Sequence, residues 1–288
     1  MENIKIVKCS EASDDDIYNA FAEGFSDYMI EIKLSKVEFF ARFFGAEGNK
    51  RDNSHIAYDY ERPVEVVLGG VITYDDIKTL RCGTLSVVPA YRRKGLGRML
   101  MNKHEEIGRD NNCQMLMLEV ISENERAVDF YEELGYEKAY FLRYYTLKEL
   151  RKFPGRGLVV DKIRQEMINR IKPILNETHI NWQNSLDYTD KLQNINYYGI
   201  TSRSNLVSFI IFDNKGKIFR MWTHPGHRRE GHGVALLHKV IEVTGRQELY
   251  MSVSSNAGIS NFLRRFGFEK DSLYQYEMIR PLILFVLT

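Results

Sequence analysis

The fold is decided by one stretch, Val87-Val88-Pro89-Ala90-Tyr91-Arg92-Arg93-Lys94-Gly95-Leu96-Gly97-Arg98. An apolar run at 80–88 leads into its basic turn, and a run with helical periodicity follows it. The expected order is therefore strand, glycine-rich turn and helix. Gly95 and Gly97 allow the main chain to curl, so that consecutive N–H groups and the positive end of the helix dipole point at one spot. With the cations around it, this turn is suited to hold a diphosphate.

Basic turns with two glycines are common on protein surfaces, but this turn is repeated. Residues 87–106 align with residues 223–242, and eight of the twenty positions are identical. A second block repeats in the same order, since Asn124 precedes Gly135 by eleven residues and Asn256 precedes Gly267 by eleven. Two repeated blocks in the same order indicate a duplicated domain. The identical pairs of the first block are Pro89/Pro225, Arg92/Arg228, Arg93/Arg229, Gly95/Gly231, Gly97/Gly233, Leu100/Leu236, Lys103/Lys239 and Glu106/Glu242.

These motifs resemble those of the GNAT superfamily of acyl-CoA-dependent N-acyltransferases. The phosphate loop of that family, R/Q-x-x-G-x-G/A, is matched by Arg92, Gly95 and Gly97, and again by Arg228, Gly231 and Gly233. A later family signature is an Asn followed by a helix with F-Y-x-x-x-G-F/Y, and it is matched by Asn124, Phe130, Tyr131, Gly135 and Tyr136. The resemblance covers about residues 3–147 in full and about 197–280 more loosely.

The resemblance implies an α/β (α+β) chain with two tandem GNAT folds, each a mixed, mostly antiparallel sheet flanked by helices. We expect an N-terminal acetyltransferase domain at 1–150, a linker and connecting helix at 151–196, and a degenerate GNAT-like domain at 197–288. The implied activity is acetyl-CoA-dependent N-acetyl transfer, by direct transfer in a ternary complex, to a primary amine or a peptide N-terminus. The alternative is a non-catalytic protein that binds or senses CoA, in which both copies are structural.

The same resemblance implies roles for individual residues. Tyr131 matches the general acid of the family. Glu119, at the end of the strand next to the loop strand, is our first choice for the general base, with Glu31, Glu65 and Asp75 left open. The expected binding residues for acetyl-CoA are Val87, Val88, Arg92, Arg93, Lys94, Gly95, Leu96, Gly97, Arg98 and Asn124, with Val87 and Val88 acting through their main chain.

The second copy departs from the motif at two chemical positions. Leu263 stands where the first copy has Tyr131, and Glu230 replaces Lys94 in the loop. We therefore expect this copy to be inactive, with a role in packing, in shaping the acceptor site or in a homodimer. His224, His227 and His232 cluster in the same loop. No metal is expected, because the segment lacks paired cysteines and a clear fourth ligand.

Composition narrows the function classes. The chain has 288 residues, with 40 basic and 39 acidic side chains, a balance that argues against a nucleic-acid or anionic-membrane binder. Cys9, Cys82 and Cys113 are odd in number and form no C-x-x-C pair, which indicates free thiols and a cytoplasmic location. Neither a leader nor an apolar run of membrane-spanning length is expected.

Several local elements can also be predicted. Ser13 begins an acidic helix start, and a second helix is expected at about 35–44. The Gly69-Gly70 pair in the strand at 64–74 indicates a β-bulge or a close backbone approach. Gly135 is expected to end the helix that follows Asn124. Residues 159–175 have helical periodicity, and the terminal apolar run 282–287 is expected to be a buried strand or an interface.

Overall fold

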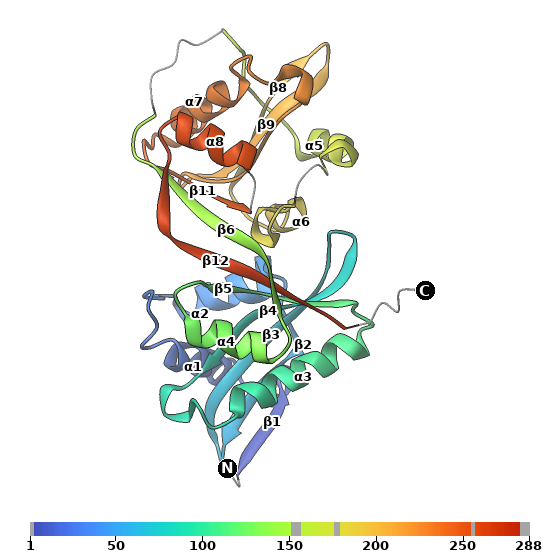
Figure 1. The fold of residues 1–288 in the computed structure, drawn as a ribbon, viewed down its shortest axis with the longest axis vertical. Helices are drawn as coiled ribbons and strands as arrows, with labels where there is room; N and C mark the ends of the chain where they lie inside the picture. The colour runs from blue at the N-terminus through green and yellow to red at the C-terminus, as the bar shows by residue number, and fades with distance from the viewer. Residues whose placement is uncertain (1–2, 151–156, 176–178, 255–256, 283–288) are drawn as a thin grey trace. The chain divides into compact units, whose positions relative to one another are not determined.

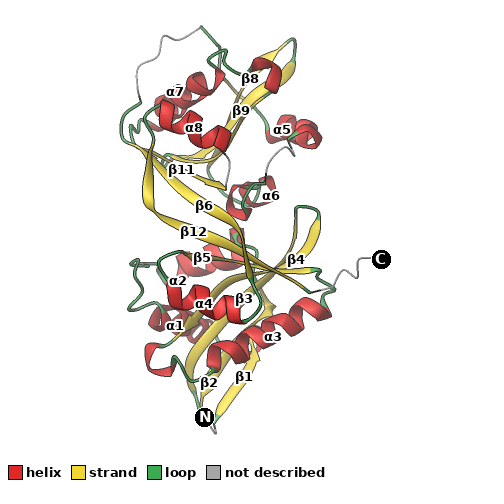
Figure 2. Cartoon of the chain, viewed as in Figure 1, coloured by secondary structure: helices red, strands yellow, loops and turns green. Residues whose placement is uncertain are grey.

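The computed structural model describes residues 3–150, 157–175, 179–254 and 257–282. The chain forms two compact units. Unit 1 comprises Met1–Val120, Asn124–Ala139 and Glu277–Thr288, and unit 2 comprises Ile121–Glu123 and Tyr140–Tyr276. Figures 1 and 2 show the helices and strands of both units.

The sheet of unit 1 is mixed and mostly antiparallel. Its strands are ordered β1-β2-β3-β4-β5-β12. The first four strands pair in antiparallel fashion, whereas β5 is parallel to β4. The strand bounds are β1 Ile4–Lys8, β2 Lys50–Asp59, β3 Arg62–Tyr74, β4 Ile77–Val87, β5 Met115–Ile121 and β12 Glu269–Pro281.

Helices cover both faces of this sheet. Neighbouring positions on β3 show the two sides, because a side chain at Gly69 would meet His104 of α3, whereas one at Gly70 would meet Asn49. The face opposite α3 carries an apolar core formed by α1 and α2, with Phe21, Phe39 and Phe43 in ring contact. The helices of unit 1 are α1 Asp14–Gly24, α2 Lys36–Phe40 with a π-helical continuation at Ala41–Ala46, α3 Leu96–Asp110 and α4 Glu125–Glu133, with short 3₁₀ turns at Cys9–Glu11 and Pro89–Tyr91.

The central strand β4 is bulged and then separates from β5. The register with β3 shifts between Leu68 and Gly69, so that Gly83 is the extra residue on β4. The parallel register of β4 with β5 covers Thr79–Arg81 and Met115–Met117, and the described residues beyond it are not paired. The last part of β4, which leads into the glycine-rich turn, therefore has an open edge.

Unit 2 repeats this plan. Its strands are ordered β6-β11-β10-β9-β8-β7. The strand before the second loop, β10, is parallel to β11 and has a bulge with Phe219 as the extra residue. The bounds are β6 Glu137–Leu147, β7 Asp161–Lys162, α5 Gln165–Ile171, α6 Leu186–Thr189, β8 Ile195–Ser202, β9 Asn205–Asp213, β10 Lys217–Thr223, α7 His232–Thr244, β11 Leu249–Ser254 and α8 Ala257–Arg265, with 3₁₀ turns at Lys172–Ile174, Trp182–Asn184 and Pro225–His227.

The compact units do not follow a single boundary at residue 150. Strand β6 comes directly after the first copy in sequence, yet Leu142–Leu147 pair with β11 of the second copy. Conversely, the last residues of β12 belong to unit 1, where Glu277 accepts a hydrogen bond of 2.8 Å from the Tyr74 hydroxyl and the Leu282 N–H donates to the Gln114 carbonyl. Each unit is thus completed by a strand from the other half of the sequence.

The segment 151–196 differs from the predicted linker. Residues 151–156 lie outside the described residues, but Leu150 and Val160 belong to the apolar core of unit 2. Within the predicted helix 159–175, the structure has strand β7, which pairs with β8, and then helix α5. The β-branched residues Val159, Val160 and Ile163 flank the two-residue strand. Their spacing also fits one face of a helix, which is why the sequence predicted a helix here. The second copy therefore has counterparts of β1 and α1 that the sequence did not reveal.

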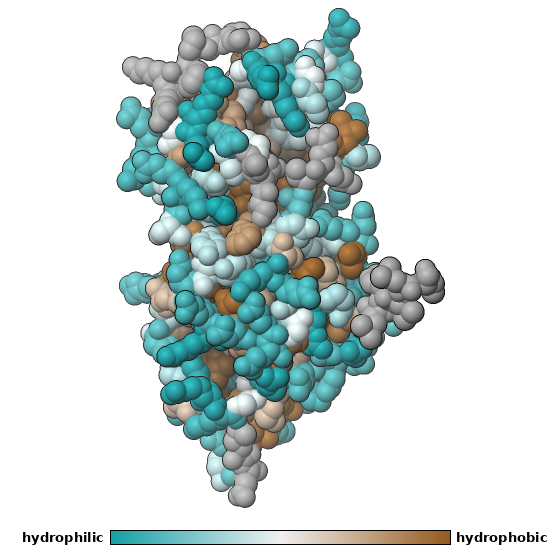
Figure 3. Space-filling view, in the orientation of Figure 1, coloured by the Kyte–Doolittle hydropathy of each residue, from teal (hydrophilic) through white to brown (hydrophobic). Residues whose placement is uncertain are grey.

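Most of the other local predictions are confirmed. The Ser13 hydroxyl caps α1, and Gly135 follows α4 with φ of 84°. The glycine pair at 69–70 marks a close backbone approach, because Cβ atoms there would clash with the carbonyl oxygens of Asn53 and Gly48. The predicted bulge is displaced, since its extra residue is Gly83 of β4. The terminal run 283–287 lies outside the described residues. On the face shown in Figure 3, the surface is mainly hydrophilic with scattered apolar side chains. Among the described residues, no helix has both the length and the apolar character needed to cross a membrane.

Candidate active site

The turn between β4 and α3 has the geometry predicted for an anion-binding loop. Gly95 has φ of 81° and Arg93 has φ of 61°, and Gly95 is the N-cap of α3. Whereas Ser13 caps α1 and Asn124 caps α4, the Gly95 N-cap has no side chain to bond the first N–H groups of α3. The first hydrogen bond of the helix runs from the Met99 N–H to the Gly95 carbonyl. The preceding N–H groups of α3 therefore point out of the helix, where an anion would bind.

The cations of the loop have different surroundings. The Arg92 guanidinium forms two hydrogen bonds of 2.7 and 2.9 Å with Asp27, and it also donates to the carbonyls of Gly24 and Val87. Its bond to the Asp27 carboxylate lowers the pKa of Asp27. Arg92 therefore fixes the loop against the end of α1, and it can contribute to an anion site chiefly through its main chain.

The other cations lie nearer to solvent. Arg93 and Lys94 are exposed, with the Lys94 ammonium 5.1 Å from the centre of the Tyr91 ring. Arg98 forms an exposed ion pair of 2.9 Å with Glu133. Exposed ion pairs are weak and exchange readily. Arg93, Lys94 and Arg98 are thus available to a phosphate group at the start of α3.

Gly97 is required by packing as well as by the loop. A Cβ atom at this position would lie 3.3 Å from Cζ of Phe130 and 3.6 Å from Oε1 of Glu65. The glycine therefore allows the ring of the second family signature to lie against the first turn of α3. The two signatures, separate in the sequence, meet at this contact.

The register of β4 distinguishes the N–H groups of Val87 and Val88, the two residues expected to act through their main chain. The Val88 N–H donates to the Val64 carbonyl at 3.0 Å, so it is engaged and is not a donor to the open edge. Glu65 and Val87 form the next pair in the ladder. Hydrogen-bonded and non-hydrogen-bonded pairs alternate in antiparallel strands, so the Val87 N–H points away from β3. The same alternation directs the Leu85 N–H to the open edge, a position that the sequence analysis did not include.

Tyr131 lies in α4 and is 8% exposed. Burial raises the pKa of its hydroxyl well above the ordinary value, with smaller contributions from Cys82, Tyr136, Tyr28 and Glu65 nearby. The phenol therefore keeps its proton at neutral pH and can act as a hydrogen-bond donor. Asn124 has the capping role, since its Oδ1 accepts from the Ala127 N–H at 3.3 Å, and its side chain also bonds the Tyr28 hydroxyl.

Glu119 is buried beside a guanidinium. Its carboxylate lies 3.5 Å from Arg81, which also pairs with Glu47 at 2.8 Å. Burial raises the pKa of Glu119 to about 7, although Arg81 acts in the opposite direction. Its Oε1 atom has no hydrogen-bond partner in the described part of the chain. A carboxyl group with this pKa can take up a proton near neutral pH.

Glu65 is the most isolated carboxyl group of the site. It is fully buried, and neither carboxyl oxygen has a hydrogen-bond partner among the described residues. Burial alone raises its pKa to about 8. The sequence signal was a single acid within the apolar run 64–68. Of the other acids left open, Glu31 pairs with Lys33 at the surface, and Asp75 lies in the β3–β4 turn with φ of 46°.

A pocket opens between α1 and the segment that follows it. Its lining combines aromatic and apolar side chains, Phe25, Tyr28 and Ile32 among them, with the ion pair of Glu31 and Lys33. Met29 and Ile30 lie outside the lining and are exposed. Tyr28 connects the pocket to Asn124 and Tyr131.

The second loop repeats the backbone of the first. Gly231 and Arg229 have φ of 91° and 68°, and Arg228 donates to the Thr223 carbonyl as Arg92 does to that of Val87. A Cβ atom at Gly233 would lie 2.6 Å from the Phe262 ring. The chemistry differs, however, because Leu263 is fully buried in the core of unit 2 and offers no proton.

Both halves of the sequence match known acetyltransferase domains. Residues 15–136 match the Acetyltransferase (GNAT) family, and residues 162–279 match the Acetyltransferase (GNAT) domain. The chain belongs to the GNAT acetyltransferase family. Its tandem arrangement agrees with the two matches and with the fold of both units.

Individual relatives are distant. The bovine thialysine N-epsilon-acetyltransferase is 41% identical over 49 residues, which are 17% of this chain and 29% of that protein. The chain thus spans less than a third of the length of that relative. A tandem GNAT protein from the clavulanic acid biosynthesis pathway is 13% identical, with a TM-score of 0.68 over 96% of this chain and 98% of that one. A GCN5-related N-acetyltransferase from Sphaerobacter thermophilus is 15% identical, with a TM-score of 0.67 over 98% and 96%. These two likenesses concern the fold.

Proposed function

We propose that unit 1 is an acetyl-CoA-dependent N-acetyltransferase that transfers the acetyl group directly to a primary amine in a ternary complex. The observation that carries the proposal is Tyr131, a protonated phenol buried near Cys82 of β4, at the position where unit 2 has the core residue Leu263. In this proposal the diphosphate of acetyl-CoA binds the first N–H groups of α3, and the thioester lies along the open edge of β4.

Direct transfer is supported by the state of the cysteines. Cys82 contributes to the raised pKa of Tyr131 and is the thiol that a covalent acetyl-enzyme would use. Burial raises the pKa of Cys82 to about 12. A thiol with this pKa is almost fully protonated at pH 7, whereas the thiolate is the nucleophile. The amine itself therefore attacks the thioester.

The attack needs a neutral amine and a donor for the oxyanion. An alkyl amine with a pKa near 10.4 is about 3.4 units from deprotonation at pH 7, a cost of roughly 4.6 kcal/mol. We assign the uptake of this proton to Glu119, whose pKa of about 7 suits a base at neutral pH. The Val87 N–H, directed away from β3, is assigned to the developing oxyanion.

Tyr131 is assigned to the leaving thiolate. A thiol has a pKa near 8.5, and even an unperturbed phenol near 10 would need roughly 2 kcal/mol to transfer its proton completely. The raised pKa of Tyr131 increases this cost. A hydrogen bond that stabilises the thiolate is therefore its main contribution, Tyr131 keeps its proton, and the thiolate takes a proton from water after it leaves.

The acceptor is assigned to the pocket beside α1. Its aromatic and apolar side chains suit the carbon chain of an amine or a peptide N-terminus. Glu31 is paired with Lys33 in the same lining, so it would have to leave this exposed pair to bind an ammonium group. The name of the bovine relative makes an alkyl ω-amine the first acceptor to test, with thialysine as one member of the panel.

The test is a panel of amines with acetyl-CoA, read by release of the CoA thiol from the full chain. We expect turnover with at least one amine, and loss of that turnover in Tyr131→Phe. A chain that binds acetyl-CoA but turns over no amine would contradict this proposal and support the non-catalytic alternative.

Two matched variants test the base. If Glu119 is the base, Glu119→Gln abolishes the rise of kcat/KM with a midpoint near pH 7, and Glu65→Gln leaves this rise in place. If Glu65 is the base instead, the midpoint lies near pH 8 and disappears in Glu65→Gln alone. The second result would transfer the assignment to Glu65.

A further inference from the structure

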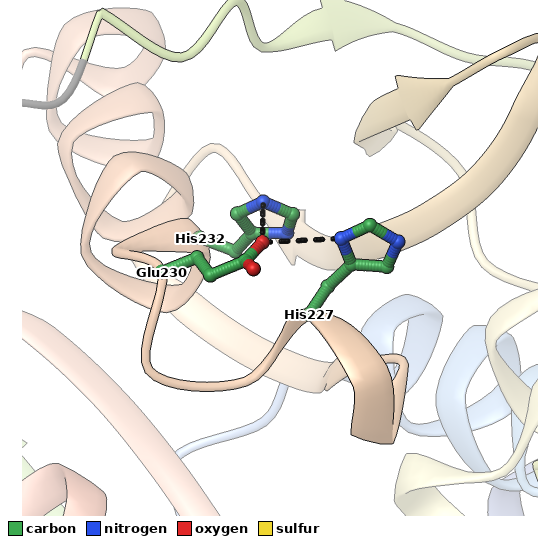
Figure 4. A group of neighbouring side chains, drawn as sticks. All are labelled: His227, Glu230 and His232. Atoms are coloured by element: carbon green, nitrogen blue, oxygen red, sulfur yellow. Dashed lines mark hydrogen bonds and ion pairs between the residues drawn. The ribbon is translucent and has the colours of Figure 1, made fainter.

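The second loop brings three metal-ligating side chains together. His227 ends the 3₁₀ turn Pro225–His227, Glu230 lies in the loop, and His232 is the first residue of α7. Figure 4 shows the two imidazoles approaching the Glu230 carboxylate from different sides. The loop conformation, with positive φ at Arg229 and Gly231, turns the three side chains toward one another.

The distances are close to those of a tetrahedral metal site. Nδ1 of His227 lies 3.1 Å from Oε2 of Glu230, Nε2 of His232 lies 3.8 Å from the same oxygen, and the three ligand atoms are all within 4.8 Å of one another. For metal–ligand bonds of 2.0–2.1 Å, tetrahedral geometry separates ligand atoms by about 3.3 Å. The two distances to Glu230 lie on either side of this value, and the His227 and Glu230 side chains are exposed enough to turn toward an ion.

The surroundings provide both fixed and adjustable ligands. The His232 side chain is 5% exposed and is held by the first turn of α7, while those of His227 and Glu230 are 33% and 51% exposed. The distance of 3.8 Å is too long for a hydrogen bond, so the carboxylate does not satisfy His232 as it satisfies His227. An ion between the three groups would join all of them.

We propose that His227, Glu230 and His232 bind one divalent transition-metal ion, with Zn²⁺ as the reference ion and a further coordination position open to solvent. Two imidazoles and a carboxylate suit Zn²⁺, Co²⁺ or Ni²⁺, whereas Ca²⁺ and Mg²⁺ prefer oxygen ligands throughout. The sequence analysis considered only the three histidines of this loop, whereas the structure adds the carboxylate of Glu230 as a ligand.

The first copy provides an internal contrast. The aligned positions in its loop are Tyr91, Lys94 and Leu96, which offer no metal ligands of this kind. Replacing Lys94 by Glu230 changes a loop suited to an anion into one suited to a cation. Arg229 and the positive end of α7 oppose a cation, so we expect weaker binding than at a closed structural zinc site.

The test uses the full chain without a histidine tag, treated with a chelator and then freed of it. Titration with Zn²⁺ by calorimetry, and with Co²⁺ by its visible absorption, should give one ion per chain. Glu230→Gln and His232→Ala should each weaken binding at least tenfold, because even groups that only support a ligand contribute about 10–100-fold. His238→Ala is the matched control, since His238 lies on the exposed side of α7. It should bind as the unchanged chain does.

A thermal melt accompanies each titration. The ion should raise the Tm of the unchanged chain and of His238→Ala, but not that of Glu230→Gln. The proposal would be overturned if the folded chain bound no ion at about 100 μM free Zn²⁺. Equal binding by the unchanged chain and by Glu230→Gln would overturn it as well, because the ion would then lie elsewhere.

Discussion

Single residues distinguish two units whose loops have the same backbone conformation. Tyr131 and Leu263 occupy equivalent places in α4 and α8, yet only the first offers a proton, and the second is a core side chain with no exposure. Two buried acids of unit 1 also differ because of their neighbours. Glu65 is isolated, whereas Glu119 is partly compensated by Arg81, and this difference decides how each responds to pH.

Tyr131→Phe should lower kcat by roughly 10²-fold or more, while the Kd for acetyl-CoA remains nearly unchanged, because the hydroxyl acts mainly in the transition state. Leu263→Ala is the comparison. It should lower the free energy of unfolding by about 2–5 kcal/mol through the cavity it leaves and affect the chemical step much less. Steady-state kinetics and urea unfolding measure the two effects. Equal rate losses in both variants, at matched folding, would refute an active site confined to unit 1.

Glu65 should make the chain less stable as pH rises. Its pKa is raised from 4.5 to about 8 in the folded protein. The folded state therefore holds a proton that the unfolded state has lost, so the stabilisation is complete below about pH 4.5 and is lost as pH rises toward 8. Glu65→Gln should remove the contribution of Glu65 to this loss, which is on the order of 3–4 kcal/mol between pH 5 and 8. Glu119, whose pKa is also raised, keeps its own smaller contribution in both chains. Urea unfolding of both chains at the two pH values tests it. The same decline with pH in both would show that Glu65 is not its source.

At the scale of elements, the site depends on a helix without a side-chain cap. Helix α3 begins at a left-handed glycine with no capping side chain, and Gly97 leaves room for Phe130 of α4. The loop, the first turn of α3 and the start of α4 therefore form one packed group. An added side chain at Gly97 would disturb this packing and enter the proposed diphosphate site.

Gly97→Glu should abolish acetyl-CoA binding, because a carboxylate would lie beside the diphosphate. Its Cβ would also approach Phe130 at 3.3 Å, so Gly97→Ala separates the two causes. The alanine variant should keep measurable affinity, since the ring must yield by only a few tenths of an ångström. Calorimetric titration of both variants, with circular dichroism to confirm folding, provides the data. Wild-type affinity in Gly97→Glu would rule out the predicted loop site.

The elements with strong local signals could be predicted from the sequence, and the others could not. Ser13 and Gly135 are local cap signals, and the structure has both. Strand β7 has two residues and α5 has seven, too short for periodicity to identify. Whether the Val88 N–H is engaged depends on strand register, and the Arg92 pair with Asp27 depends on tertiary contact. Neither can be read from a motif.

At the scale of the whole molecule, the two loops differ in charge. Arg92, Arg93, Lys94 and Arg98 give the first loop a formal charge of +4, whereas Arg228, Arg229, Glu230 and Val234 give the second +1. Two unit charges 4 Å apart interact by about 4 kcal/mol at an effective dielectric of 20. Screening and the ion pairs of Arg92 and Arg98 reduce this difference, yet about 1.4 kcal/mol is enough for a tenfold difference in affinity.

Each unit contains a strand from the other half of the sequence, so the stability of each half depends on the other. We call this arrangement the strand exchange. A chain ending at residue 150 lacks the end of β12, so β5 loses a neighbour and Tyr74 loses Glu277. We expect this fragment to melt well below the full chain or to aggregate, because an exposed strand edge pairs with other chains. Circular dichroism melts and size-exclusion chromatography measure both outcomes. A monomeric fragment with the Tm of the full chain would show that the exchanged strand contributes little.

The most direct test of the account is the number of acetyl-CoA molecules that one chain binds. Calorimetric titration of the full chain at micromolar ligand should give one site, because the first loop has the cations and the second has Glu230. Glu230→Lys should add a second, weaker site without adding turnover, since Leu263 still offers no proton. Two equivalent sites in the unchanged chain, or a single site that persists in Gly97→Glu, would contradict the assignment of binding and catalysis to unit 1.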